Sequence, residues 1–98
     1  MISTKQRAFL RALAAETTPV TQVGKNGVTE PLIKTVSDAL EAHELVKLSV
    51  LETCPATPRE VSDALCAALS CDPVQVIGRK LSLYRPASDP EKRKIQLK

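Results

Sequence analysis

Apolar residues change their spacing several times between the N-terminus and residue 85. In three segments they recur every three or four positions, which is the period of an amphipathic α-helix. Between these segments lie short runs rich in Val, Leu and Ile that end at glycine, proline or polar residues, as strands do. The pattern predicts helices at 3–15, 29–43 and 57–70, and extended segments at 20–23, 45–51, 74–77 and 81–84.

Each predicted helix begins at a residue suited to cap it. Ser3 with Gln6, and Thr57 with Glu60, have the spacing of a capping box, in which two side chains satisfy free backbone amides at the helix start. Thr29 is the expected N-cap of the middle helix. The proline that follows lies in the first turn, where its missing N–H has no partner to lose.

The first predicted helix separates apolar from basic positions. At about 100° per residue, Arg7 and Arg11 share one face beside the apolar arc, whereas Lys5 lies on the opposite flank. The apolar arc consists of Ile2, Phe9, Leu10 and Leu13.

The order of elements indicates an α/β protein. Helix, strand, helix, strand, helix, strand, strand is an αβαβαββ chain, which predicts a single small domain with one sheet and helices packed against it. The last two strands form a hairpin around a turn at 78–80. Residues 1–85 are expected to form this domain. The composition shifts to Pro, Ser and charged residues over 86–98, which predicts a loosely ordered basic tail.

Composition narrows the cellular setting. Only Phe9 and Tyr84 are aromatic, so Leu, Val, Ile and Ala must build the core. No apolar run approaches the roughly 18 to 20 residues of a membrane span. The first residues lack the apolar core and the small-residue cleavage site of a signal peptide. Three cysteines cannot all pair within one chain, so we expect reduced thiols and a cytoplasmic protein.

Catalytic chemistry has little support in the sequence. His43 is the single histidine, and Cys66 and Cys71, five positions apart, lack a second pair of metal ligands. We therefore expect no enzyme activity, no catalytic residue, no metal and no cofactor. The net charge is only +3, from 14 basic and 11 acidic residues, so the positions of the cations matter more than their total.

The segment Gly24-Lys25-Asn26-Gly27 lies between a predicted strand and a predicted helix. Two glycines three apart allow a sharp turn and close approach of a ligand to the backbone, and Lys25 adds a positive charge at the tip. Free amides at the following helix start would favour phosphate. A turn that simply needs glycines is the alternative explanation of these four residues. Walker A and dinucleotide-binding patterns are absent.

The chain as a whole resembles the CRM domain family (chloroplast RNA splicing and ribosome maturation), in particular its stand-alone bacterial, YhbY-like members. The resemblance covers about residues 2 to 85 in uninterrupted order. It rests on Thr4-Lys5-Gln6-Arg7-Ala8, on Val23 to Val28, on Asp38 to Lys47, and on Gln75-Val76-Ile77-Gly78 followed by Leu81, Leu83, Tyr84 and Arg85.

The resemblance implies a four-stranded mixed sheet packed with helices, similar to the C-terminal domain of translation initiation factor three. It also implies RNA binding, association with precursors of the large ribosomal subunit, and RNA contact by the loop from Gly24 to Gly27 and by Lys5, Arg7 and Arg11. His43 stands where relatives often carry arginine, so a contact there would be weaker or pH-dependent.

The residues themselves agree with a phosphate-binding surface, provided that the fold brings the cations together. With so few aromatic residues, recognition should rest on phosphates, 2′-hydroxyls and RNA shape. Lys34 and Lys47 fit an ordinary solvated face better. Two alternatives remain, a general module for another structured RNA and an adaptor that contacts a ribosomal protein; a monomer is expected in each case. The candidate RNA-binding residues are Lys5, Arg7, Arg11, Gly24, Lys25, Asn26, Gly27, Arg79 and Lys80.

Overall fold

The computed structural model describes residues 2–87 of the 98-residue chain. Its helices and strands follow the predicted order, and each boundary lies within two residues of the predicted one. Most of the predicted basic tail, residues 88–98, lies outside the described residues. The elements are α1 (Thr4–Ala15), β1 (Thr21–Val23), α2 (Glu30–His43), β2 (Leu45–Val50), α3 (Pro58–Leu69), β3 (Asp72–Ile77) and β4 (Lys80–Tyr84).

The predicted caps are confirmed. Ser3 and Gln6 form a capping box at α1, and Thr57 and Glu60 form one at α3. The hydrogen bond from the Thr57 backbone N–H holds the pKa of the Glu60 carboxyl below its ordinary value, because it stabilises the carboxylate. Thr29 caps α2 by accepting a hydrogen bond from the backbone N–H three residues on.

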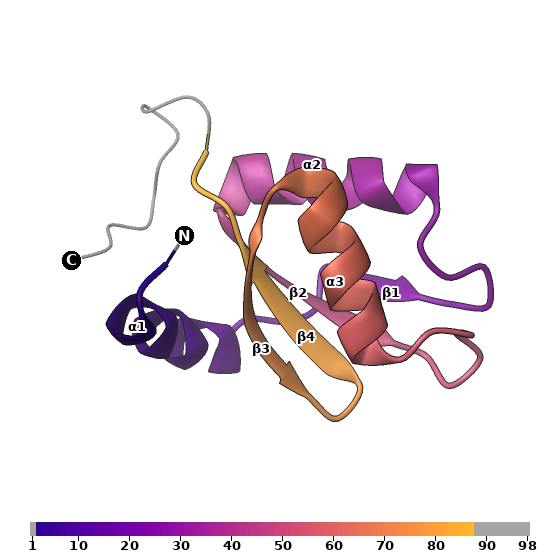
Figure 1. The fold of residues 1–98 in the computed structure, drawn as a ribbon, viewed down its shortest axis with the longest axis horizontal. Helices are drawn as coiled ribbons and strands as arrows, with labels where there is room; N and C mark the ends of the chain where they lie inside the picture. The colour runs from indigo at the N-terminus through magenta and orange to yellow at the C-terminus, as the bar shows by residue number, and fades with distance from the viewer. Residues whose placement is uncertain (1, 88–98) are drawn as a thin grey trace.

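The four strands form one mixed sheet in the order β1-β2-β4-β3 (Figure 1). β1 and β2 are parallel, with α2 as the crossover between them, and the remaining pairs are antiparallel. β3 and β4 form the predicted hairpin. The four-stranded mixed sheet is therefore confirmed, and β2 and β4 are its central strands.

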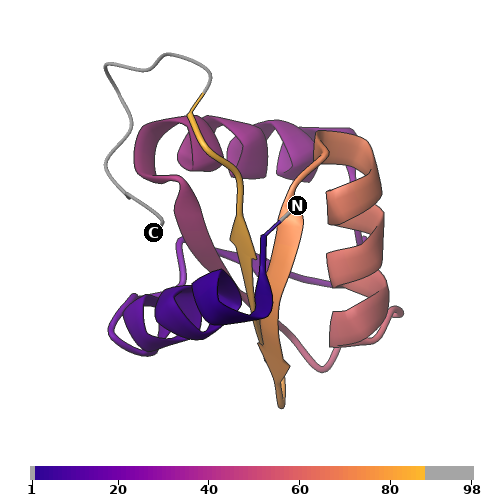
Figure 2. The same ribbon diagram turned by 60° about the vertical axis from the view of Figure 1, so that its left-hand side comes forward.

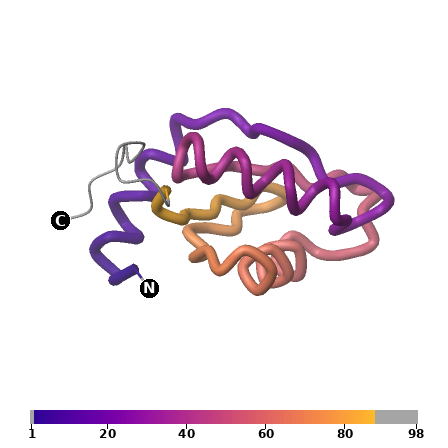
Figure 3. The backbone as a smooth tube through the Cα atoms, turned by 90° about the horizontal axis from the view of Figure 1, so that it is seen from above, coloured from indigo at the N-terminus to yellow at the C-terminus, as the bar shows by residue number. Residues whose placement is uncertain are grey.

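The helices cover the two faces of the sheet unequally. α1 and α3 lie on opposite sides of it (Figure 2), and α2 shares the α3 side. The main core lies under α2 and α3 and consists of aliphatic side chains such as Val36, Leu40, Leu48 and Leu65. Seen from above, α1 lies at one end of the molecule, and the β1–α2 loop lies at the other (Figure 3).

A smaller apolar cluster holds α1 on the second face. Leu10 and Ala14 of the helix are buried there against Leu45 and Tyr84 of the sheet. Phe9 was expected on the same apolar arc, but its side chain is 48% exposed. The contact stripe is narrow, and Phe9 lies about 100° around the helix from Leu10, so it falls outside the stripe.

Arg85 joins the middle of α2 to the C-terminal end of α3. Its guanidinium donates to the Leu69 carbonyl at 3.2 Å and to both the carbonyl and the hydroxyl of Ser37, each at 3.2 Å. Its backbone N–H donates to the Glu44 carbonyl at 2.9 Å. The buried Glu44 carboxylate in turn accepts from the backbone N–H of Ala87 at 3.0 Å, two residues past the expected end of the domain. Among these acceptors, the Leu69 carbonyl lies at the end of α3, where it has no intrahelical donor.

We expect Arg85→Met to lower the free energy of unfolding by about 1 to 3 kcal/mol, because it removes the donor to the partly buried Leu69 carbonyl and Ser37 hydroxyl while keeping similar side-chain bulk. Urea denaturation followed by circular dichroism measures the loss. Arg59→Met, at an exposed position of α3, is the matched control and should change stability little. Equal stability of the two variants would contradict a structural role for Arg85.

Candidate nucleic-acid interface

The loop between β1 and α2 contains a closed turn. The Gly27 backbone N–H donates to the Gly24 carbonyl at 2.9 Å, which leaves Lys25 and Asn26 exposed at the tip. Gly27 has φ +65°, in the left-handed region that favours glycine. Gly24 lies outside that region, and a Cβ there would meet only the Leu51 side chain at 3.9 Å, an ordinary contact. The turn therefore requires glycine at Gly27 and not at Gly24.

The helix start after this loop is less open to an anion than the sequence predicts. The Thr29 hydroxyl already accepts from the Leu32 backbone N–H at 3.2 Å, and Glu30 places a negative charge in the first turn of α2. The cap occupies one free amide, and the Glu30 carboxylate offsets part of the positive potential at the start of α2, so both reduce its attraction for an anion. The charge that the loop itself offers to a phosphate is the exposed ammonium of Lys25.

Leu51 joins this loop to the β3–β4 turn. Its backbone N–H donates to the Val23 carbonyl at 2.9 Å, and its own carbonyl accepts from Arg79 Nη1 at 3.3 Å. The position of a Gly27 Cβ lies 3.7 Å from the Pro55 side chain. The β1–α2 loop, the β2–α3 connection and the Arg79 turn thus meet at one end of the sheet.

The face of the sheet that α1 covers is apolar at one end and polar at the other. The pair Leu45 and Tyr84 lies beneath the helix. One step along the strands, Lys47 pairs with Ser82, and Ser82 pairs with Gln75. The next row contains Ser49, Lys80 and Ile77 in register. These two polar rows form the open part of the sheet face.

A groove of about 310 Å³ crosses the open part of this face beside α1. Three of its lining residues are cations from three different elements, Arg11 of α1, Lys47 of β2 and Lys80 of β4, and none is acidic. Lys47 Nζ donates to the Ala14 carbonyl at 3.2 Å. Within residues 2–87, the side chains of Arg11 and Lys80 make no hydrogen bond or ion pair. The groove therefore holds positive charge without a nearby counter-charge.

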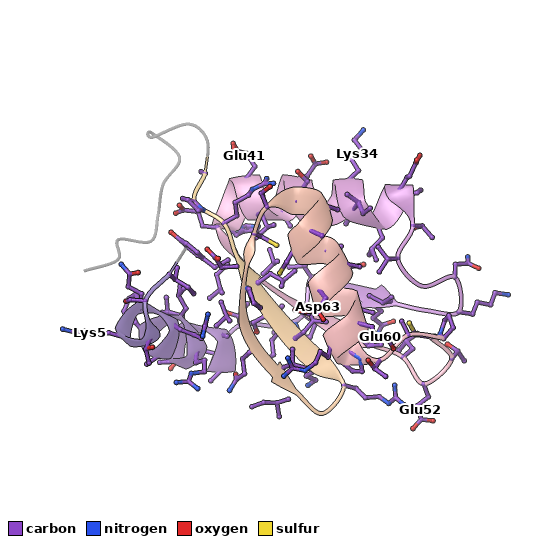
Figure 4. All side chains as sticks on the ribbon, in the orientation of Figure 1. Lys5, Lys34, Glu41, Glu52, Glu60 and Asp63 are labelled. Atoms are coloured by element: carbon purple, nitrogen blue, oxygen red, sulfur yellow. The ribbon has the colours of Figure 1, made fainter. Side chains whose placement is uncertain are left out.

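The structure distributes the predicted basic residues unevenly. Arg11 and Lys80 meet at the groove, and Arg79 lies beside the start of the Gly24–Gly27 loop. Arg7 instead lines a separate groove of about 230 Å³ along β3, together with the carboxylate of Asp63. Lys5 points away from the sheet at the far end of the molecule (Figure 4).

Lys47 is a candidate interface residue that the sequence analysis assigned to an ordinary solvated face. The signal for it was present, because Lys47 and Ser49 alternate with buried residues along β2 and so face away from the main core. The sequence does not reveal that α1 stops short of these residues. The positive charge of Lys47 matters for anion binding because Arg11 and Lys80 line the same groove.

The histidine and the cysteines lie outside the groove. No group of three or more potential metal ligands occurs among the described residues. Cys54, Cys66 and Cys71 are free thiols. Burial raises the pKa of Cys71 to about 12 and also raises that of Cys66, so both remain protonated and weakly nucleophilic at neutral pH. His43 lines a different pocket, of about 530 Å³, at the far end of α2 from the Gly24–Gly27 loop.

Comparison with known proteins decides the family. The family described as CRS1 / YhbY (CRM) domain matches residues 2–85. This chain belongs to the CRM domain family. The probable RNA-binding protein YqeI of Bacillus subtilis is 41% identical over 97 residues, covering 99% of both chains. An RNA-binding protein of Haemophilus influenzae is 40% identical over 96 residues, covering 98% of this chain and 94% of its own.

A solved structure of a similar protein confirms the fold. The solution structure of SAV1595 from Staphylococcus aureus matches with a TM-score of 0.79 and 34% identity, over 98% of this chain and 100% of that one. The α/β fold expected from the order of elements, and the CRM resemblance noted in the sequence, are both confirmed. Within this CRM domain, the described helices include none long and apolar enough to cross a membrane.

The turn geometry predicts different outcomes for the two loop glycines. Gly27→Ala should lower the free energy of unfolding by about 1 kcal/mol, because its backbone lies in the left-handed region. Gly24→Ala should leave stability nearly unchanged, since its Cβ makes only an ordinary contact. Urea denaturation of both variants measures the difference. Equal losses would contradict this account of the turn.

Proposed function

We propose that this protein binds RNA without catalysing a reaction, and that its RNA is the large-subunit ribosomal RNA in precursor particles, where it assists ribosome assembly in the cytoplasm. The main observation behind this proposal is the groove lined by Arg11, Lys47 and Lys80, which has three cations and no acidic residue. Membership of the CRM family and relatives named as RNA-binding proteins support RNA as the partner.

The proposed interface extends over much of the molecule. It begins at the exposed tip of the Gly24–Gly27 loop with Lys25 and Asn26, includes Arg79, and continues across the open sheet face to Arg11. The molecule measures 38 Å along its longest axis, so one RNA segment would have to contact several separated points. Binding at spaced phosphates fits a protein that recognises the shape of a folded RNA.

The sheet itself provides no aromatic platform. Tyr84 is 5% exposed and lies beneath α1, and Phe9 lies on α1 away from the sheet contacts. Base stacking on the sheet, as in RRM domains, therefore has no side chain to support it. Phosphate contacts should dominate the affinity, which then falls steeply with salt because bound counterions are released from the RNA.

The family membership favours RNA over a protein partner. We assign the domain to residues 1–85 and propose that it acts as a monomer.

The salt dependence of binding distinguishes an RNA complex from an adaptor that binds a ribosomal protein through apolar contacts. Only the affinity of the RNA complex falls steeply as the salt concentration increases.

Lys25→Ala should weaken RNA binding and reduce the slope of log affinity against log salt by about one unit, since one phosphate contact is lost. Fluorescence anisotropy with a large-subunit ribosomal RNA fragment, repeated over a range of salt concentrations, measures both effects. Lys34→Ala is the matched control, because Lys34 points outward from α2 (Figure 4). Unchanged affinity and slope for Lys25→Ala would place the loop outside the interface.

Charge reversal tests the groove in cell extracts. Arg11→Glu combined with Lys80→Glu should abolish co-sedimentation with large-subunit precursors, because each reversal replaces attraction to phosphate by repulsion. The melting temperature should change little, since both side chains are exposed. Lys92→Glu combined with Lys94→Glu makes the same change of charge outside the CRM match. Loss of association in this second variant alone would assign binding to residues 86–98.

A further inference from the structure

Ser82 presents its hydroxyl to the groove beside α1. The residue is only 3% exposed, yet it lines the groove between α1 and the β3–β4 hairpin. Its side chain makes no hydrogen bond within residues 2–87. Its Oγ is not one of the described buried polar atoms that lack a partner, so it remains accessible from the groove. The hydroxyl is therefore available to donate to, or accept from, a ligand that enters the groove.

The residues around Ser82 differ in chemistry. Gln75, its neighbour in register on β3, supplies an amide with both donor and acceptor groups. Ile77, which is 62% exposed, adds an apolar surface to the same groove. Arg11, Lys47 and Lys80 add positive charge. A ligand that uses all of these needs an anionic group, an apolar face and polar edges.

A single nucleotide combines these three features. Its phosphate suits the cations, one face of its base suits Ile77, and its base edge or ribose hydroxyls suit Ser82 and Gln75. The groove volume of about 310 Å³ lies at the lower end of small-ligand pockets, which span roughly 300 to 1,000 Å³. That volume suits one nucleotide and excludes a segment of double helix.

Paired RNA cannot present a nucleotide in this way. In an A-form helix the bases are stacked and paired, and proteins reach them mainly through the shallow minor groove. Loops and bulges, by contrast, contain unstacked bases that can enter a protein pocket. We propose that the groove holds one unpaired nucleotide of the bound RNA, an inference that rests on the proposed RNA-binding function.

The neighbouring row of the sheet continues the path of the RNA. Ser49 pairs with Lys80 on one side and with Gln22 on the other, and Gln22 lies two residues before Gly24. A strand that leaves the nucleotide in the groove therefore has a polar route across β2 and β1 to the Gly24–Gly27 loop. The nucleotide in the groove fixes the register of the RNA, and the loop contacts a phosphate farther along.

The test uses two RNA hairpins that differ in one nucleotide. The stem of the first carries a single bulged 2-aminopurine, and the second has the same stem without the bulge. Anisotropy of an end label measures affinity, and 2-aminopurine fluorescence reports whether the base changes its surroundings on binding. The protein should prefer the bulged hairpin by about tenfold and should change its 2-aminopurine signal.

Ser82→Ala and Ile77→Ala should each remove most of this preference while leaving the affinity for the paired hairpin unchanged. Ser82→Ala should leave the melting temperature nearly unchanged, because the hydroxyl makes no hydrogen bond within residues 2–87 that the substitution would remove. Thr35→Ala is the control and should retain the preference, since Thr35 is exposed on α2 and does not line the groove.

Three results would overturn the inference: equal affinity of the native protein for both hairpins, a retained preference in both groove variants, or an equal loss for both hairpins in them. Each of these can occur while the protein still binds RNA, so each leaves the proposed function standing. Failure of the proposed function has a different signature. In that case neither hairpin binds, or binding of both is unaffected by reversing the charges of Arg11 and Lys80.

Discussion

The fold depends on the alternation of side chains along the central strand β2. Val46, Leu48 and Val50 point into the main core under α2 and α3, whereas Lys47 and Ser49 point to the opposite face. A shift of one residue in its pairing would bury Lys47 and expose three aliphatic side chains, which burial energetics strongly oppose. Pairing with both β1 and β4 then transmits this register to the rest of the sheet.

The same alternation creates the polar face and limits how much of it a helix covers. α1 has 12 residues, so it spans about 18 Å, and its apolar stripe reaches only the row of Leu45 and Tyr84. The bond from Lys47 Nζ to the Ala14 carbonyl marks the point where coverage ends, and a cation at a helix C-terminus is favourable. Lys47 thus contributes both to anchoring α1 and to the charge of the groove.

The candidate interface combines turns that are far apart in the chain. Leu51 makes this possible, because its backbone bonds to β1 and to the side chain of Arg79. A change in any of these three segments would move the others. The loop glycines are not equivalent in this arrangement. The turn requires glycine at position 27, because the backbone there has a positive φ. The backbone at position 24 does not require glycine, and the missing side chain of Gly24 leaves space beside the loop.

Local sequence determined the helices, the strands and their order. Capping residues such as Ser3, Thr29 and Thr57 act within four residues, and the period of apolar positions distinguishes helix from strand without reference to the rest of the chain. These signals, with the CRM motifs, were sufficient for the fold. The exposure of Phe9 could not be predicted, because it depends on the width of the contact between α1 and the sheet.

Tertiary structure alone decided which cations act together. Arg7 and Arg11 look equivalent on a helical projection, yet one lies near Asp63 and the other beside Lys80. Lys47 looked like an ordinary surface residue because the residues that meet it in the groove are 28 or more positions away in the chain. The physical reason is that electrostatic interactions depend on distance in space and on burial, and strand pairing sets both. Sequence therefore determined the scaffold and the kinds of residue available, whereas the packing of α1 on one end of the sheet determined the groove.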